Sequence, residues 1–245
     1  MKKEAFINTI NPRFFNGICH RGLHNKLYTE NGLLAFKNAI DHNLAFEFDI
    51  HLTKDNQPIV IHDSNLFRVT NKDGIVEELT LAEIKNNYIL LNGEKIPTLE
   101  EVLALNNEKV PMVIELKIYK NNYHKMVTLL LEKLQCIRDK KNVMLISFDP
   151  RAMLKLRKKG FPRQLLVEIK YKWVYHLRFF FDSLDLEVEM LNWKKVQKYA
   201  KKHFINVWTI DDLNKLALAK KYADVITFQN LDYHLVKEVS QENNI

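Results

Sequence analysis

Short apolar segments alternate with helical ones along most of this chain, and this alternation restricts the possible fold more than any other feature. The helical stretches have apolar residues at helical spacing and lie at 31–42, 123–137, 192–203 and 211–222. Eight strands separated by helices in 245 residues predict an α/β fold, the (β/α)8 or TIM barrel. The predicted strands are NGICH (16–20), LAFEFDI (44–50), PMVIELKI (111–118), NVMLISF (142–148), RQLLVEI (163–169), DSLDLEV (182–188), FINVWTI (204–210) and ADVITF (223–228).

A doubly wound open sheet is the alternative fold for the same alternation. Such sheets bind nucleotides through a glycine-rich turn after the first strand, with a GxGxxG or Walker A pattern. Neither pattern follows residues 16–20. We therefore predict a barrel, with residues 1–245 forming one domain.

The alternation is interrupted after the second strand. The segment HLTKDNQPIVIHD (51–63) takes the place of a helix, and residues 64–110 follow before the next barrel strand. Two short helices are expected there, at 79–87 and 98–106, because Thr80 with Glu83 and Thr98 with Glu101 have the spacing of capping boxes. We interpret 51–110 as a hairpin arm and a small helical insertion, the latter at 64–110 on one end of the barrel.

The composition is consistent with a large apolar core and limits the possible partners. Hydrophobic residues make up 47% of the chain, and the formal net charge is +7. The basic residues are scattered through stretches such as 155–160 and 194–203, so we interpret them as a solvated surface and expect no nucleic-acid partner. A positive field would still favour an anionic substrate such as a phosphodiester.

The sequence lacks the features of membrane and secreted proteins. Residues 1–15 contain no apolar core of a signal peptide, and no apolar run approaches the roughly 18 residues that a membrane span needs. Cys19 and Cys136 cannot form a disulfide framework. We expect a cytoplasmic protein without stable membrane insertion.

Two carboxylates lie in an otherwise apolar strand. Residues two apart share a face of a strand, so Glu47 and Asp49 point one way and their apolar neighbours the other. Two ionised carboxylates so close repel each other, and burial adds to the free-energy cost of keeping them charged. A divalent cation such as Mg²⁺ or Ca²⁺, which prefers oxygen ligands, would remove both problems. The alternative is an antiparallel edge strand with a solvated face.

Another predicted strand repeats this pattern. Glu115 and Lys117 share a face between apolar residues, and Glu115 can serve as a third carboxylate. Lys117 can pair with Glu115 structurally or hold a phosphate as a point charge.

Histidines lie at the ends of the first predicted strand and of the arm. His20, Arg21 and Gly22 end the first strand, where catalytic groups of a barrel are found. If Asp55 and Asn56 form a two-residue hairpin turn, His62 returns opposite Asp49, whereas a longer turn would shift this register. Pro58 donates no hydrogen bond, so the returning strand should lie outside the barrel.

These residues resemble the glycerophosphodiester phosphodiesterase family in order and spacing. The matching motifs are HRG (20–22), TENGLLAF (29–36), FEFDIHLTKDNQPIVIHD (46–63), ELTLAEIK (78–85), IPTLEEVL (96–103), VIELK (113–117), ISFDP (146–150), VWTID (207–211) and DVITF (224–228). The resemblance implies a TIM barrel with a small insertion after the second strand. It also implies hydrolysis of glycerophosphodiesters to glycerol 3-phosphate and an alcohol. The expected partner is therefore a small-molecule substrate.

The resemblance further implies a role for each candidate residue. One divalent cation, Mg²⁺ or Ca²⁺, would be held by Glu47, Asp49 and Glu115. His20 and His62 would be the acid and base, and we favour His20 as the acid. Water or the glycerol 2-hydroxyl would be the nucleophile. The substrate-binding candidates are Arg21 and Lys117 for the phosphate, Trp208 for the glycerol, and Glu30, expected near the metal or His20.

Three positions depart from the family pattern. Thr29 replaces a proline, Asn56 replaces a glycine of the hairpin, and Phe228 replaces an acidic residue, a change that could alter the substrate pocket. The aromatic run 171–181 leaves a second activity open, lysophospholipase D or a cyclising phospholipase, if it forms an apolar collar rather than an amphipathic helix. A non-catalytic binding protein on the same fold is the third possibility.

Overall fold

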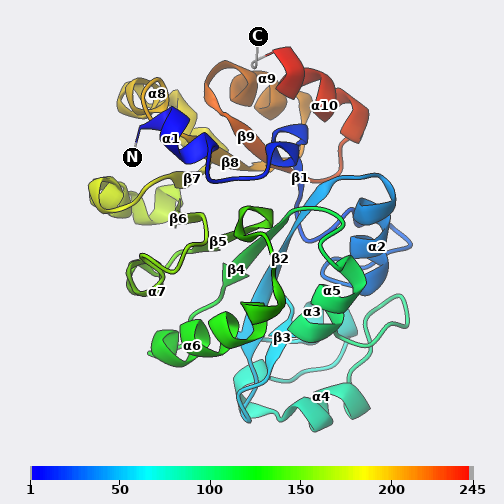
Figure 1. Ribbon diagram of the computed structural model, residues 1–245. Helices are drawn as coiled ribbons and strands as arrows, with labels where there is room; N and C mark the ends of the chain where they lie inside the picture. The colour runs from blue at the N-terminus through cyan, green and yellow to red at the C-terminus, as the bar shows by residue number, and fades with distance from the viewer. Residues whose placement is uncertain (1, 243–245) are drawn as a thin grey trace.

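The computed structural model describes residues 2–242, and within them the eight predicted barrel strands form a closed parallel barrel (Figure 1). The barrel is closed because its first strand pairs in parallel with both its second and its last strand. The predicted fold is thus confirmed. The barrel strands are β1 (Ile18–Cys19), β2 (Ala45–Leu52), β4 (Met112–Leu116), β5 (Val143–Ser147), β6 (Arg163–Val167), β7 (Leu184–Glu187), β8 (Ile205–Ile210) and β9 (Val225–Phe228).

Helices surround the barrel and bury the outward faces of its strands (Figure 1). On β2, Phe46 packs outward against Phe36 of a helix, with their rings stacked 4.9 Å apart. The surrounding α-helices are α2 (Leu33–Asp41), α6 (Tyr123–Lys133), α7 (Pro150–Lys155), α8 (Lys194–Ala200), α9 (Leu213–Tyr222) and α10 (Tyr233–Glu242), with 3-10 helices η3 (Leu134–Cys136), η4 (Lys140–Asn142), η5 (Ile169–Phe180) and η6 (Val188–Asn192). No helix in the described part of the chain is both long and apolar enough to span a membrane.

The N-terminal segment closes one end of the barrel. It contains α1 (Lys3–Ile7) and η1 (Pro12–Asn16). Phe6 and Phe14 join an apolar cluster with side chains of the barrel interior such as Val113. With this end filled by apolar side chains, the interior of the barrel opens toward the opposite end, where the parallel strands finish.

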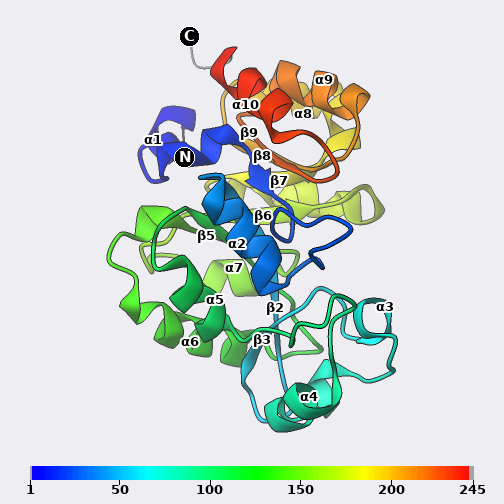
Figure 2. The same ribbon diagram turned by 90° about the vertical axis from the view of Figure 1, so that its right-hand side faces the viewer.

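The arm and insertion after β2 carry an apolar cluster of their own. β3 (Pro58–Val60) pairs antiparallel with β2 and lies outside the barrel, as Pro58 predicts. The remaining elements are α3 (Phe67–Thr70), η2 (Val76–Glu78), α4 (Leu81–Asn87) and α5 (Leu99–Asn106). In Figure 2, α3 and α4 lie at the opposite end of the molecule from both termini. Both predicted capping boxes are present, with Thr80 and Glu83 at α4 and Thr98 and Glu101 at α5.

The predicted two-residue turn of the hairpin is wrong. Thr53 N donates to Gln57 O at 3.1 Å, so three residues, 54–56, make the loop. The added residue is Lys54, while Asn56 of the predicted turn has a left-handed φ of 62°, a conformation that asparagine tolerates better than most residues. The longer loop moves the register by one, and Asp49 O accepts a hydrogen bond from Ile61 rather than lying opposite His62.

Candidate active site

A pocket of about 80 Å³ lies where the barrel strands finish, and it collects most of the candidate residues. Seven of the nine candidates line it, while Asp49 is buried within the barrel and Glu30 lies outside the lining. The side chains that line it are His20, Arg21, Glu47, His62, Glu115, Lys117, Ile146, Phe148, Leu166, Asp185, Trp208, Thr209 and Thr227.

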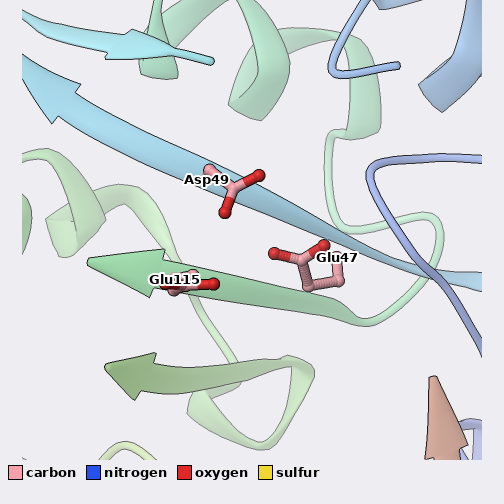
Figure 3. A group of neighbouring side chains, drawn as sticks. All are labelled: Glu47, Asp49 and Glu115. Atoms are coloured by element: carbon pink, nitrogen blue, oxygen red, sulfur yellow. The ribbon is translucent and has the colours of Figure 1, made fainter. Parts of the chain in front are cut away.

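Glu47, Asp49 and Glu115 converge inside the barrel from two neighbouring strands (Figure 3). In parallel pairing, Asp49 of β2 lies beside Glu115 of β4, and Glu47 lies two residues earlier on the same face. One carboxylate oxygen of each residue lies within 4.8 Å of the others. Glu47 Oε1 is buried without a hydrogen-bond partner among the described residues. The group therefore has the oxygen-rich chemistry of a divalent cation site.

The buried carboxylates differ in how easily they ionise. Burial raises the pKa of Glu47, and the charges of Asp49 and Glu115 raise it further. Burial likewise raises the pKa of Glu115 to about 7, although Lys117 opposes this. Burial also opposes ionisation of Asp49, yet Lys117, His62 and Arg21 together hold its pKa well below the usual value. Asp49 is thus the most firmly ionised of the three.

Two cations balance part of this negative charge. Lys117 Nζ lies 2.6 Å from Glu115 Oε1 and 3.0 Å from Asp49 Oδ1. Burial alone would lower the pKa of Lys117, but Asp49 and Glu115 raise it above the usual value. The Arg21 backbone N–H donates to Glu47 Oε2 at 3.0 Å, and Arg21 Nε lies 3.5 Å from Asp49 Oδ2. Both cations therefore stay charged and fix the positions of the carboxylates.

His20 is held by a residue that the sequence interpretation missed. Its Nδ1 lies 2.7 Å from Gln229 Oε1, and because an amide oxygen only accepts, Nδ1 carries the proton and Nε2 is left as an acceptor. Burial, followed by the charge of Arg21, lowers the pKa of His20 to about 4. Gln229 directly follows β9, so its place at the end of a barrel strand was the signal that could have identified it.

We expect Gln229→Glu to raise the pKa of His20, because a carboxylate beside Nδ1 stabilises the imidazolium. The imidazolium would then persist to higher pH, which is testable by following the His20 ring protons by NMR during a pH titration. Gln229→Ala, which removes the acceptor without adding charge, should leave the pKa low. An unchanged titration of His20 in Gln229→Glu would contradict this contact.

His62 is oriented by an ion-pair network that reaches back to Arg21. Its Nδ1 lies 2.6 Å from Asp63 Oδ1, and Asp63 Oδ2 accepts from Arg68 Nε at 2.5 Å. Arg68 also binds both oxygens of Glu30, and Glu30 pairs with Arg21 at 2.8 Å. Burial lowers the pKa of His62, an effect that Asp49 partly offsets.

Glu30 was expected near the metal or His20, and its direct contacts are instead with Arg21 and Arg68. Burial opposes its ionisation, but the hydrogen bonds from Arg68 and the charge of Arg21 lower its pKa to about 2. Its contact with Arg21 connects it to the carboxylates of the site.

Two further polar side chains of the site were also missed. Asn31 lies in the loop before α2, and its Nδ2 donates a hydrogen bond to Asp49 Oδ2 at 2.9 Å. Asp185 lines the pocket, and burial raises its pKa well above the usual value. Asp185 stands between two apolar residues of β7, the same alternation that identified Glu47, so the pattern could have found it.

Trp208 and Phe228 lie on different faces of the barrel wall. Trp208 lines the pocket and packs edge-on against Phe148, with ring centroids 5.6 Å apart. Phe228 pairs with Cys19 in the sheet and packs outward in the cluster under the helices. The expectation that Phe228 could alter the pocket is therefore wrong, because this position faces away from it.

Comparison with known proteins agrees with this geometry. The model of the glycerophosphoryl diester phosphodiesterase family matches residues 20–221. A glycerophosphodiester phosphodiesterase of Caldanaerobacter subterraneus is 42% identical over 92 residues, which are 35% of this chain and 37% of that protein. The chain aligns with less than half the length of the first curated relatives that it matches.

Solved structures share the fold over nearly their whole length. A glycerophosphodiester phosphodiesterase of Parabacteroides distasonis has a TM-score of 0.75 at 24% identity, covering 93% of this chain and 97% of that one. An Oleispira antarctica phosphodiesterase, solved with the product sn-glycerol-3-phosphate, has a TM-score of 0.75 at 22% identity and covers 93% and 96%. Since the family model covers most of the chain and the barrel carries its motifs together, the protein belongs to the glycerophosphoryl diester phosphodiesterase family.

Proposed function

We propose that this protein hydrolyses glycerophosphodiesters to glycerol 3-phosphate and an alcohol. The observation that carries the proposal is the meeting of two histidines, two cations and a buried carboxylate group at one end of a barrel of this family. The product seen in the related Oleispira antarctica structure is consistent with this substrate class.

We propose that Glu47, Asp49 and Glu115 hold one divalent cation, Mg²⁺ or Ca²⁺. Their oxygens fit such an ion, because they are buried close together and Glu47 Oε1 has no hydrogen-bond partner among the described residues. When bound, the cation would act as a Lewis acid on a phosphoryl oxygen.

His62 is the proposed base and His20 the proposed acid. His62 has a carboxylate partner at Nδ1, which fixes its tautomer and stabilises the imidazolium formed on proton uptake. It would remove a proton from water or from the substrate's 2-hydroxyl, the second route giving a cyclic phosphate. His20 would deliver a proton from Nε2 to the leaving alkoxide, and an anionic phosphate in the pocket favours its protonated form.

Arg21 and Lys117 are the proposed contacts of the phosphate. Both line the pocket as stable cations, and positive charge there would stabilise the negative charge that develops on the nonbridging oxygens. Trp208, which lines the same pocket, is the proposed apolar contact of the glycerol carbons.

A panel of phosphodiesters tests the function. We expect release of glycerol 3-phosphate from glycerophosphocholine, glycerophosphoethanolamine or glycerophosphoglycerol in the presence of Mg²⁺ or Ca²⁺, measured with a coupled dehydrogenase assay. Release of free phosphocholine would show that the other ester bond is cleaved and would contradict the proposal. Complete inactivity would instead favour a binding protein on this fold.

A lysophospholipase D or a cyclising phospholipase activity is the second candidate. A groove of about 690 Å³ adjoins the pocket, shares Glu115, Lys117 and Phe148 with it, and is lined further out by Tyr119 and Trp173. Such a groove can accept an acyl chain, which the small pocket cannot. Faster turnover of lysophosphatidylcholine than of glycerophosphocholine would favour this activity.

A further inference from the structure

The segment η5 exposes an unusual amount of aromatic surface. Trp173, Phe179 and Phe180 are 60%, 76% and 63% exposed, and Ile169 and Tyr171 are exposed beside them. These five belong to one twelve-residue element, which stands out as the yellow-green coil near the β6 label in Figure 1. The segment therefore leaves a large aromatic surface uncovered.

The same element is fastened to the barrel by its other side chains. Val174 and Tyr175 are buried, and Tyr175 OH donates to Lys195 O at 3.2 Å. The Arg178 guanidinium lies over the rings of Tyr175 and Phe179, at 4.6 and 4.1 Å from their centroids. The exposed rings are thus presented on an anchored support.

Positive charges are interleaved with the exposed rings. Lys170 and Lys172 are exposed on either side of Tyr171, and Lys195 lies against Tyr175 from α8. Acidic residues occur only at the ends of the segment, where Glu168 precedes it and Asp182 pairs with Arg163. Aromatic rings combined with lysine and arginine are the composition with which peripheral proteins bind anionic bilayers.

The segment also lies at the mouth of the candidate active site. It directly follows β6, and Trp173 lines the groove that shares Glu115 and Lys117 with the pocket. A surface that rests on η5 would therefore lie beside the entrance to the pocket.

We propose that η5 docks the protein on the surface of an anionic lipid bilayer, with the exposed rings at the level of the headgroups and Lys170 and Lys172 on the lipid phosphates. This inference does not depend on the proposed function, because binding can be measured without turnover. The occupant is a bilayer rather than a protein, because strongly hydrated lysines among the rings fit fluid anionic headgroups better than a desolvated protein interface.

Co-sedimentation with vesicles tests this proposal. We expect the protein to sediment with equimolar phosphatidylcholine and phosphatidylglycerol, to bind vesicles of phosphatidylcholine alone at least about tenfold more weakly, and to be released in part by high salt. Equal binding to both kinds of vesicle, or to neither, would overturn the proposal.

Two pairs of substitutions locate the surface. Phe179→Ala with Phe180→Ala, and separately Lys170→Glu with Lys172→Glu, should each weaken binding to the anionic vesicles at least about tenfold. Leu154→Ala with Leu213→Ala, exposed apolar residues of α7 and α9, is the matched control and should bind normally.

Circular dichroism melting would show that each variant is folded. Wild-type binding in both η5 variants would overturn the proposal. So would a dimer in analytical ultracentrifugation that the Phe179 and Phe180 substitutions dissociate, since η5 would then be a protein interface.

Discussion

Replacing His20 or His62 by alanine is expected to lower turnover of a glycerophosphodiester by a factor of at least about 10² while the barrel stays folded. The two rings line one pocket, and each has its Nδ1 occupied by a separate partner, Gln229 for His20 and Asp63 for His62. Each ring therefore offers Nε2 for proton transfer, and losing either removes one of the two transfers that the reaction requires.

The measurement is kcat for glycerophosphocholine with saturating divalent cation, beside circular dichroism of each variant. His124→Ala is the matched control, because this histidine is exposed on α6, away from the pocket. Near-normal turnover in either pocket variant would remove that histidine from the acid and base pair. A loss of the folded spectrum would point to a structural role instead.

Removing divalent cations with a chelator is expected to abolish activity, and Mg²⁺ or Ca²⁺ should restore it. Burial and mutual repulsion raise the pKa of Glu47 and Glu115 beside Asp49, and a bound divalent cation would stabilise all three carboxylates in their ionised form. Glu47→Gln keeps the shape of the side chain and removes one charge, and it should raise the metal concentration for half-maximal activity at least about tenfold.

A thermal melt gives a second measurement that needs no substrate. Metal binding to the folded state should raise the Tm of the wild type in proportion to the logarithm of the metal concentration, and Glu47→Gln should show a smaller rise. Glu132→Gln on the exposed face of α6 is the control. Full activity in the presence of chelator would exclude the metal hypothesis.

The hairpin shows where prediction from sequence ended. Pro58 was enough to place β3 outside the barrel, because a residue without an N–H cannot continue an interior ladder. The loop length was not predictable, because it depends on the left-handed conformation of Asn56 and on the hydrogen bond from Leu81 N to Asp55 Oδ1. Leu81 belongs to the insertion, so a distant segment helps to fix the turn.

The end of β9 gives a second example. The family pattern suggested that Phe228, in place of an acidic residue, could alter the pocket, but in the strand that pairs with β1 Phe228 faces outward beside Cys19. The next residue, Gln229, then reaches His20. A shift of one position reverses the face of every side chain in a strand, and this register is set between strands about two hundred residues apart in the sequence.

The sequence by itself determined the alternation of strands and helices, the capping boxes of Thr80 and Thr98, and the shared face of Glu47 and Asp49. These are local properties, since strand and helix periods and cap spacings extend over a few residues. Only the tertiary structure decided which polar groups meet, as in the network from His62 through Asp63, Arg68 and Glu30 to Arg21. The physical reason is that ion pairs and hydrogen bonds depend on distances of a few ångströms, which the packed barrel and its insertion set.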